Sequence, residues 1–296
     1  MLSDGTRTGS ISGGCLEADL QARANRVIQM GKAEIAVYDT TGENDLVWGV
    51  GLGCHGVATV VIEPLRGEPD WTRVLRENIA ARKTTSLAVF WDKSAPQNSR
   101  TALADTTFES SAGAQIFHDD IAAPLHLLIC GAGDDARPLA QLAEGLGWVA
   151  TVCDPRSGHA TAERFPTAQA RIVCRPADLL EHVVPDAETV AVVMTHHYVH
   201  DIPLLRQLLP LDLPYVGLLG PAKRAERILS DLEGNGFEVT ETMRQRLHAP
   251  VGLDIGADGA EEVALSILAE IKARLAGRKG TPLRERNGSI HGRDSA

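Results

Sequence analysis

The chain has 296 residues, of which 44% are hydrophobic and 23% charged, a composition typical of a globular protein large enough for two domains. Its 39 acidic residues outnumber 29 lysines and arginines, so the formal net charge is -10 and no basic stripe is present for nucleic acid. No run approaches the roughly 20 apolar residues of a membrane helix, and the N-terminus lacks the apolar core of a signal peptide, so we expect a cytoplasmic protein without membrane or nucleic-acid partners.

The first part of the chain predicts a small α+β unit. A helix is expected to begin near Leu16, and β-rich runs follow at residues 33–40 and 57–65, separated by glycine-rich turns.

The next part predicts a helix around residues 70–82 and then the strand SLAVFWDK. The polar segment 92–115 that follows is expected to be a surface excursion or a linker. These features predict an N-terminal domain with its linker at residues 1–123.

From Pro124 onward, apolar strand-like runs alternate with helical periodicity, the pattern of βαβ units. The expected strands are residues 125–130, 149–154, 171–174, 189–197 and 213–220. Because these runs are continuously apolar, they predict an α/β fold, with a doubly wound, Rossmann-like parallel sheet covered by helices on both faces. A last helix is expected at 260–276, which ends the domain 124–276, and the polar tail 277–296 is expected to be disordered.

The sequence GAGDDA directly follows the first of these strands and resembles a dinucleotide-binding turn, with Gly131 and Gly133 in its small positions. Asp154, 23 residues beyond Gly131, lies where a ribose-binding carboxylate is expected, and Arg156 follows it. The turn therefore predicts a nucleotide-like ligand. The alternative is that its glycines only make a tight strand-to-helix turn, and the acidic pair that follows Gly133 weakens the case for a pyrophosphate.

The sequence MTHHYVHD closes the fourth strand, and His196 within it is expected to face a ligand at the carboxyl edge of the sheet. A metal site and a set of hydrogen-bonded loop histidines are the alternatives for this segment. Lys223 and Arg224 begin a later helix, where they either clamp an anion or belong to a solvated helix face.

The five cysteines are an odd number without CxxC spacing, so free thiols are expected. Cys15 and Cys54 each lie in a glycine-rich loop, and Cys15 precedes a helix whose N-terminus favours the thiolate, which can carry sulfur or ligate a soft metal. The remaining three are expected to be small buried apolar residues: Cys130, Cys153 and Cys174.

Seven motifs occur together in one order, and the combination resembles the XdhC/CoxI family of xanthine dehydrogenase and CO dehydrogenase accessory proteins. The motifs are GSISGGCLEADL, GVGLGCHG, LLICGAGDDARPLAQLAEGLGW, VCDPR, VVMTHHYVHD, YVGLLGPAKR and PVGLDIGADGAEEVALSILAEI. The resemblance spans about residues 5–276. Members of the family usually begin some tens of residues earlier, which implies either that the N-terminal domain is truncated at its start or that the start is misassigned. His55 replaces the glycine or asparagine usual after Cys54.

The resemblance implies a non-catalytic chaperone that binds molybdenum cofactor, a molybdopterin with or without a nucleotide extension. Its implied partners are a cysteine desulfurase, which supplies the terminal sulfido ligand, and an apo molybdenum hydroxylase of the xanthine dehydrogenase type, with a homodimer as the expected state. The candidate cofactor-binding residues are Cys15, Cys54, Gly131, Gly133, Asp154, Arg156, His196, Lys223 and Arg224. The two cysteines are also the candidate molybdenum ligands. A different hypothesis is an oxidoreductase that uses the same turn for NAD(P), although a dehydrogenase has no need of the two glycine-flanked thiols.

Overall fold

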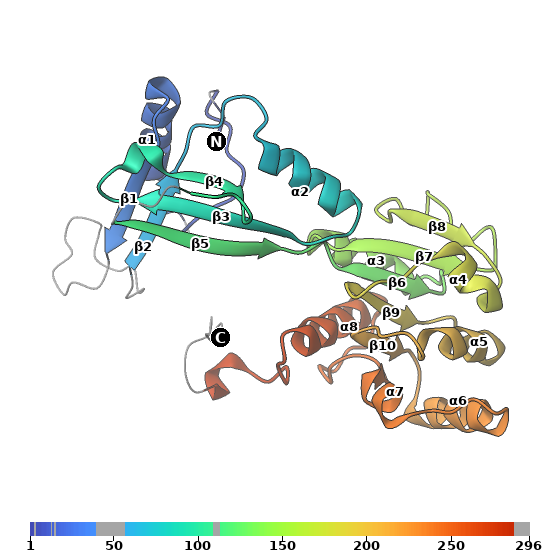
Figure 1. The fold of residues 1–296 in the computed structure, drawn as a ribbon. Coiled ribbons are helices and arrows are strands. Elements are labelled where there is room, and N and C mark those ends of the chain that lie inside the picture. Colours follow the sequence, from blue (N-terminus) through green and yellow to red (C-terminus); the bar gives the residue numbers. More distant parts are fainter. Residues whose placement is uncertain (3, 13, 15, 40–56, 109–112, 287–296) are drawn as a thin grey trace. The chain divides into compact units, whose positions relative to one another are not determined.

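The computed structural model describes residues 1–2, 4–12, 14, 16–39, 57–108 and 113–286. It divides into two compact units, Met1–Ala123 and Pro124–Ala296 (Figure 1). Within the described residues, no helix is both long enough and apolar enough to cross a membrane.

The described residues of the N-terminal unit form two antiparallel sheets and two helices. Its elements are α1 (Glu17–Met30), β1 (Glu34–Asp39), β2 (Val57–Ile62), α2 (Asp70–Ala80), β3 (Thr85–Asp92), the 3-10 turn η1 (Pro96–Asn98), β4 (Arg100–Leu103) and β5 (Ala114–Ile121). Strands β1 and β2 pair with each other, and β3 lies between β4 and β5 in the second sheet. The expected α+β character of this unit is confirmed.

The interpretation of residues 92–115 as a surface excursion or linker is wrong. Arg100–Leu103 forms β4, which pairs with Leu87–Phe90 of β3, and Ala114 begins β5, which pairs with the whole of β3. Both are edge strands with exposed or half-exposed side chains, so their sequences lack the continuous apolar run that marks a central strand.

The C-terminal unit contains a six-stranded parallel sheet in the order β11-β10-β9-β6-β7-β8. The strands are β6 (His126–Cys130), β7 (Val149–Asp154), β8 (Ala170–Val173), β9 (Thr189–Val193), β10 (Tyr215–Leu218) and β11 (Leu247–His248). The helices are α3 (Ala136–Gly145), α4 (Leu179–His182), α5 (Tyr198–Leu208), α6 (Ala222–Gly234), α7 (Glu241–Arg246) and α8 (Ala260–Leu275), with 3-10 turns η2 (Pro176–Asp178) and η3 (Leu283–Glu285). This is the predicted doubly wound α/β sheet, and its strand order reverses between β6 and β9, the place where such folds bind ligands.

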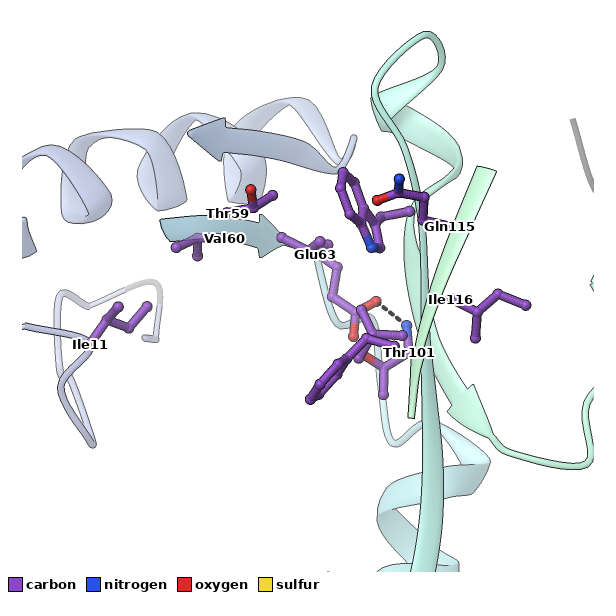
Figure 2. Close-up of a pocket in the computed structure, with 11 residues that line it drawn as sticks. Ile11, Thr59, Val60, Glu63, Thr101, Gln115 and Ile116 are labelled. Carbon is purple, nitrogen blue, oxygen red and sulfur yellow. Dashed lines mark hydrogen bonds between the residues drawn. The ribbon is translucent and has the colours of Figure 1, made fainter. Parts of the chain in front are cut away.

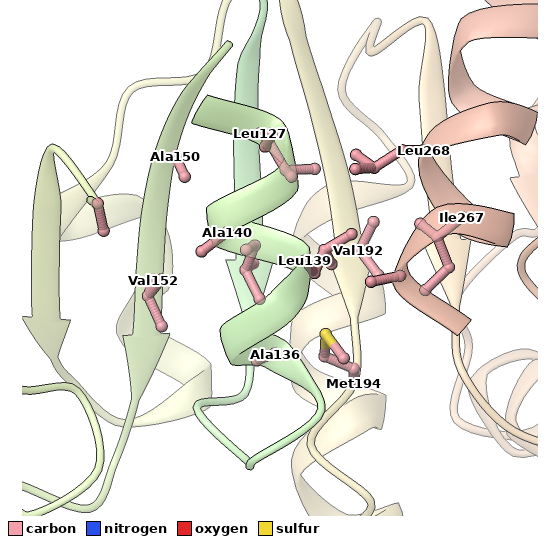
Figure 3. Packing of buried hydrophobic residues seen from close by; sticks show 14 of the residues in the cluster. Leu127, Ala136, Leu139, Ala140, Ala150, Val152, Val192, Met194, Ile267 and Leu268 are labelled. Atoms are coloured by element: carbon pink, nitrogen blue, oxygen red, sulfur yellow. The ribbon is translucent and has the colours of Figure 1, made fainter. Parts of the chain in front are cut away.

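Two hydrophobic clusters cover the two faces of the parallel sheet. On one face, Leu139 of α3 and Ile267 of α8 are fully buried in the same cluster as Val192 of β9 (Figure 3). On the other face, the neighbouring residues Ala191 and Val193 pack in a cluster with side chains of α4, α5 and α6. Successive residues of a central strand are therefore both buried, which explains the continuous apolar runs.

Buried Glu270 fastens α8 to the loop after β11. Its Oε2 accepts hydrogen bonds from the Tyr215 hydroxyl at 2.6 Å and from the Gly252 N–H at 2.8 Å. The sheet and the helix that closes one face are thus joined by a polar contact as well as by apolar packing.

Candidate functional site

The turn between β6 and α3 passes very close to the loop that follows β9. Gly131 has a φ of 118°, and a Cβ at this position would lie 2.5 Å from the carbonyl oxygen of Met194. Its N–H donates to the carbonyl oxygen of Cys153 at 2.8 Å, which ties the turn to β7 as well. Only glycine fits this conformation and this contact, so a tight turn at the reversal point of the sheet requires Gly131.

The Asp154 carboxylate is saturated by hydrogen bonds from the protein itself. Oδ2 accepts from the Ala132 N–H and from Arg156 Nη2, both at 2.8 Å. Oδ1 accepts from the backbone N–H of Arg156 at 2.9 Å and from its Nε at 2.8 Å. Asp154 is only 3% exposed, and these bonds occupy about the four acceptor positions that a carboxylate offers.

Burial disfavours the charged form of Asp154, but the hydrogen bonds from the Arg156 side chain and from the Ala132 and Arg156 N–H groups outweigh it. Together they lower the pKa of Asp154 to about 2. The residue expected to bind ribose therefore holds the β6–α3 turn and the Arg156 guanidinium in place. Arg156 keeps its Nη1 group without an acceptor among the described residues, on a side chain that is 43% exposed.

The acidic pair that precedes α3, Asp134 and Asp135, has cationic or hydrogen-bonding partners. Asp134 Oδ1 accepts from Arg164 Nη2 at 2.9 Å, and the same nitrogen donates to the carbonyl oxygen of Ala132 at 3.2 Å. Asp135 Oδ2 lies 2.6 Å from His196 Nε2. The Asp135 carboxylate also lies over Gly133, where a Cβ would come within 2.6 Å of its Oδ1. An acidic side chain of the protein thus occupies the space beside the turn.

His196 lies directly across the reversal point from α3. It has a φ of 59°, a left-handed conformation that is uncommon for a residue other than glycine. Its side chain is 58% exposed and contacts Asp135. The sequence placed His196 at the carboxyl edge of the sheet, and the structure adds the carboxylate that orients its ring.

A buried ion pair fixes the next turn of the sheet. Asp201 accepts hydrogen bonds from the Thr195 hydroxyl at 2.5 Å and from the Arg224 guanidinium, whose Nε lies 3.1 Å from Oδ2. Arg224 also donates to the carbonyl oxygen of His196 at 3.4 Å. Arg224 is therefore held by Asp201, whereas Lys223 is exposed and has no ion-pair partner among the described residues.

Seven of the nine predicted site residues lie along one edge of the parallel sheet. They end or follow four strands at the carboxyl edge: Gly131, Gly133, Asp154, Arg156, His196, Lys223 and Arg224. Cys15 and Cys54 lie outside the described residues. Among the residues that the structure does describe, no group of three His, Cys, Asp or Glu side chains is arranged to hold a metal ion, so the metal alternative for the histidine loop gains no support.

The other three cysteines are free and buried, as predicted. Burial raises the pKa of Cys130, Cys153 and Cys174, which keeps them as thiols. Their role is packing in the core rather than chemistry.

The loop that leads into α1 is organised by one carboxylate, Glu17, which is not among the predicted site residues. Glu17 Oε1 accepts from the Ser12 N–H at 2.7 Å, the Ile11 N–H at 3.2 Å and the Ser10 hydroxyl at 2.8 Å. Its Oε2 accepts from the Ser12 hydroxyl. Hydrogen bonds from the Ser12 side chain, the Ser12 backbone and Ser10 lower the pKa of Glu17. The Ser-x-Ser spacing five residues before the helical Glu17 is the signal that marks this contact.

Two family models match the chain. One, described as the XdhC Rossmann domain, matches residues 127–271, and the other, described as the XdhC and CoxI family, matches residues 1–39. A Bacillus subtilis protein named as a probable subunit of xanthine dehydrogenase is 32% identical over 289 residues, which covers 90% of this chain and 84% of the relative. The chain belongs to the XdhC and CoxI family.

The similarity to this family extends through both units. A crystal structure described as a xanthine dehydrogenase from Bacillus halodurans has a TM-score of 0.78 and 31% identity, and the match covers 93% of this chain and 85% of that one. The molybdenum cofactor insertion chaperone PaoD of Escherichia coli is 26% identical, over 90% of this chain and 74% of the relative. The turn at Gly131 and the buried Asp154 both lie within the region matched by the Rossmann model of the family.

The sequence did not predict three contacts of the site. Arg164, Asp135 and Asp201 each complete a contact between turns that are far apart in the chain. Their sequence signals are weak, because a charged residue in a loop or a first helical turn is most often solvated.

Proposed function

We propose that this protein binds molybdenum cofactor and assists the cofactor's sulfuration and insertion into a hydroxylase of the xanthine dehydrogenase type. In this proposal it acts as a homodimeric chaperone that receives sulfur from a cysteine desulfurase and hands the finished cofactor to the apo-enzyme. The support from related proteins is the similarity over 90% of the chain to a relative named as a molybdenum cofactor insertion chaperone.

The observation that carries the proposal is the preformed edge of the parallel sheet, where the rigid Gly131 turn meets exposed cationic groups. Arg156 presents its free Nη1 there while Asp154 holds the rest of the guanidinium in place. Lys223 lies at the start of α6, beyond the neighbouring turn. Arginine and lysine bind phosphate well, and a molybdopterin or its nucleotide extension carries phosphate.

The two glycine-flanked thiols supply the remaining chemistry of the proposal. A thiolate at Cys15 or Cys54 can ligate molybdenum or carry sulfur, which a core thiol with a raised pKa does not do. We therefore assign these roles to Cys15 and Cys54 and leave the buried Cys130 in the core.

The NAD(P)-dependent alternative is less compatible with the Asp154 contacts. Binding of a ribose 2′-hydroxyl requires a free carboxylate oxygen, and the Arg156 and Ala132 groups already fill both oxygens of Asp154. The Asp135 carboxylate beside Gly133 also opposes the approach of a pyrophosphate.

The deciding experiment is purification of the protein from cells that make the cofactor, with molybdenum and pterin measured per chain. We expect both to copurify in near-stoichiometric amounts. A protein that carries neither and binds NAD tightly would overturn the proposal in favour of the oxidoreductase.

The thiol assignment is tested by the variant Cys15→Ser. We expect it to lose most of the bound cofactor while its circular dichroism spectrum and urea unfolding midpoint stay unchanged, because serine keeps the size and removes the thiolate. Cys174→Ala is the matched control, since it removes a buried thiol that the proposal does not use. Equal cofactor retention by Cys15→Ser and the wild type would show that Cys15 has no part in binding.

A further inference from the structure

The N-terminal unit contains a cavity that none of the contacts described above uses. It has a volume of about 870 Å³ and lies between β2 and the sheet formed by β3, β4 and β5. Two neighbouring cavities of about 390 and 450 Å³ share Glu63 and Thr101 with it, so the three form one groove. This size is typical of sites for small molecules and cofactors.

Two carboxylates of the described residues line this groove, Glu17 and Glu63. Glu17 is already bound by Ser10, Ile11 and Ser12, whereas Glu63 is held by a backbone group. Glu63 follows the last residue of β2, and its Oε2 accepts a hydrogen bond from the Thr101 N–H of β4 at 2.7 Å. Figure 2 shows this bond between Glu63, just after the end of β2, and Thr101. Among the described residues, no group donates a hydrogen bond to the second oxygen, Oε1. The carboxylate is therefore oriented and still able to accept bonds from a ligand.

Planar apolar surface surrounds this carboxylate. The rings of Trp91 and Phe117 line the cavity, and Phe117 is 52% exposed. Ile11, on the opposite side, is 58% exposed. Large apolar side chains left exposed around one hollow are typical of a ligand site. They suit a flat heteroaromatic ring with polar edges.

The end of the groove beyond Glu63 carries positive charge. Arg66 and Arg100 line the third cavity, and no carboxylate among the described residues forms an ion pair with either. The guanidinium of Arg66 lies against the backbone at Gly31, where a Cβ would come 1.8 Å from Nη2. Gly31, with a φ of 63°, both ends α1 and leaves room for Arg66. These two arginines are available to an anion.

We propose that this groove binds the pterin of the molybdenum cofactor, with Glu63 accepting the N–H groups of the aminopyrimidinone ring and Arg66 and Arg100 binding an anionic group beyond it. The inference rests on the proposed function, because a cofactor chaperone needs a site for the pterin. A 2-amino-4-oxopyrimidine presents an amine and a ring N–H side by side. These two donors can bind the two oxygens of a carboxylate, in the same way as the two parallel N–H groups of an arginine do.

The first test is binding of a neutral probe, 6-methylpterin, to the full-length protein, followed by the anisotropy of the pterin fluorescence. Glu63→Gln keeps an acceptor for the Thr101 N–H but removes the charge and one acceptor, so we expect roughly 10- to 100-fold weaker binding. Glu77→Gln, a change at an exposed carboxylate of α2 outside the groove, is the matched control and should bind like the wild type. 6-Methyllumazine, which places a carbonyl oxygen where the amine would be, should bind the wild type as weakly as 6-methylpterin binds Glu63→Gln. Circular dichroism checks that each variant is folded.

The second test uses 6-carboxypterin, which adds a negative charge. Arg66→Gln combined with Arg100→Gln should weaken its binding roughly tenfold or more and leave 6-methylpterin unchanged. No binding of 6-methylpterin by the wild type, equal binding by Glu63→Gln, or equal loss of both probes in the arginine variant would overturn the assignment.

Retention of the whole cofactor separates this inference from the function on which it rests. If the wild type and Glu63→Gln copurify with equal molybdenum and pterin, the groove is not the pterin site although the chaperone function holds. If the wild type copurifies with neither but binds 6-methylpterin through Glu63, the chaperone function fails and the groove remains a site for pterin-like rings.

Discussion

The residues at the reversal point of the parallel sheet are fixed by contacts within the protein. Gly131 avoids a clash with the Met194 carbonyl group, and Asp154 is held by Ala132 and Arg156. The Gly131–Met194 approach and the Ala132–Asp154 bond each join residues that follow different strands, whereas Arg156 binds Asp154 within one turn. Individual residues therefore hold this edge of the sheet in place, and we expect substitutions of single residues there to have large effects that can be measured one at a time.

Gly131→Ala should destabilise the protein by roughly 2–4 kcal/mol, because alanine is strained at this φ and its Cβ overlaps the Met194 carbonyl oxygen. The measurement is the free energy of unfolding in urea. Gly145→Ala in α3 is the matched control, since its Cβ meets no atom within 4 Å, and it should be neutral or stabilising by up to about 1 kcal/mol. Equal stability of the two variants would contradict the close approach of the two turns.

The Asp154 carboxyl should titrate at about 2 when followed by NMR of carboxyl-labelled protein. Since its folded-state pKa is below the unfolded value, the contribution of Asp154 to stability is present above about pH 3.9 and is lost as the pH falls toward 2, with a size of roughly 2 kcal/mol. Arg156→Gln should raise this pKa, because burial disfavours the charged carboxylate and fewer hydrogen bonds then stabilise it. If the Asp154 carboxyl titrates near 3.9 in both the wild type and Arg156→Gln, the hydrogen bonds from Arg156 and Ala132 do not stabilise its charged form.

At the scale of elements, the start of α1 shows how a helix can order the loop before it. Leu16 at the N-cap makes no side-chain capping bond, and Glu17 at the first helical position instead bonds back to Ser10, Ile11 and Ser12. The negative charge also suits the helix N-terminus. The loop that precedes Cys15 is thereby tied to α1, although Cys15 itself lies outside the described residues.

Glu17→Gln should loosen this loop and raise the hydrogen-exchange rates of the Ile11 and Ser12 amides, because a neutral amide accepts weaker hydrogen bonds and Nε2 accepts none. Since the hydrogen bonds lower the pKa of Glu17, the wild-type loop should be protected above the unfolded pKa of about 4.3 and lose protection as the pH falls through the lowered folded-state value. Glu77→Gln is the control. Unchanged exchange in Glu17→Gln would show that the loop is ordered by other contacts.

The helices and strands differ in how easily they can be predicted from the sequence. Helix α3 is easily recognised in the sequence, because the strand, glycine turn and helical periodicity follow one another without interruption. Strand β4 escaped prediction because it has four residues, none of them buried, and its identity as a strand depends on pairing with β3. A strand that is buried on both faces can be recognised from its run of apolar residues. An edge strand lacks such a run and is recognised only from its pairing with the neighbouring strand.

At the scale of the whole molecule, the two compact units each have their own hydrophobic cluster, on either side of Ala123 and Pro124. The large clusters belong to the C-terminal unit and cover both faces of its sheet. A unit with a core of this kind is expected to fold without the rest of the chain.

Residues 124–276 expressed alone should therefore fold cooperatively. We expect a single urea transition, an α/β circular dichroism spectrum and an Asp154 carboxyl that still titrates at about 2. A fragment that is unfolded, or that titrates near 3.9, would show that the C-terminal unit depends on the N-terminal one.

The sequence by itself determined the doubly wound sheet, the turn at Gly131 and the buried thiols, because these depend on local periodicity and on residue types that tolerate few environments. The sequence also predicted that Asp154, Arg156, His196 and Arg224 lie at one edge of the sheet, since the carboxyl ends of parallel strands lie at the same edge.

Only the tertiary structure decided what those side chains contact. Asp154 bonds to Ala132, Arg224 to Asp201, and His196 to Asp135, across separations of 22 or more residues that no local pattern records. The same is true of Glu63, whose bond to Thr101 spans two sheets and makes an ordinary strand-end carboxylate the fixed acceptor of a groove. Hydrogen bonds act over about 3 Å in space whatever their separation along the chain, so the pairing of charges is settled by the fold.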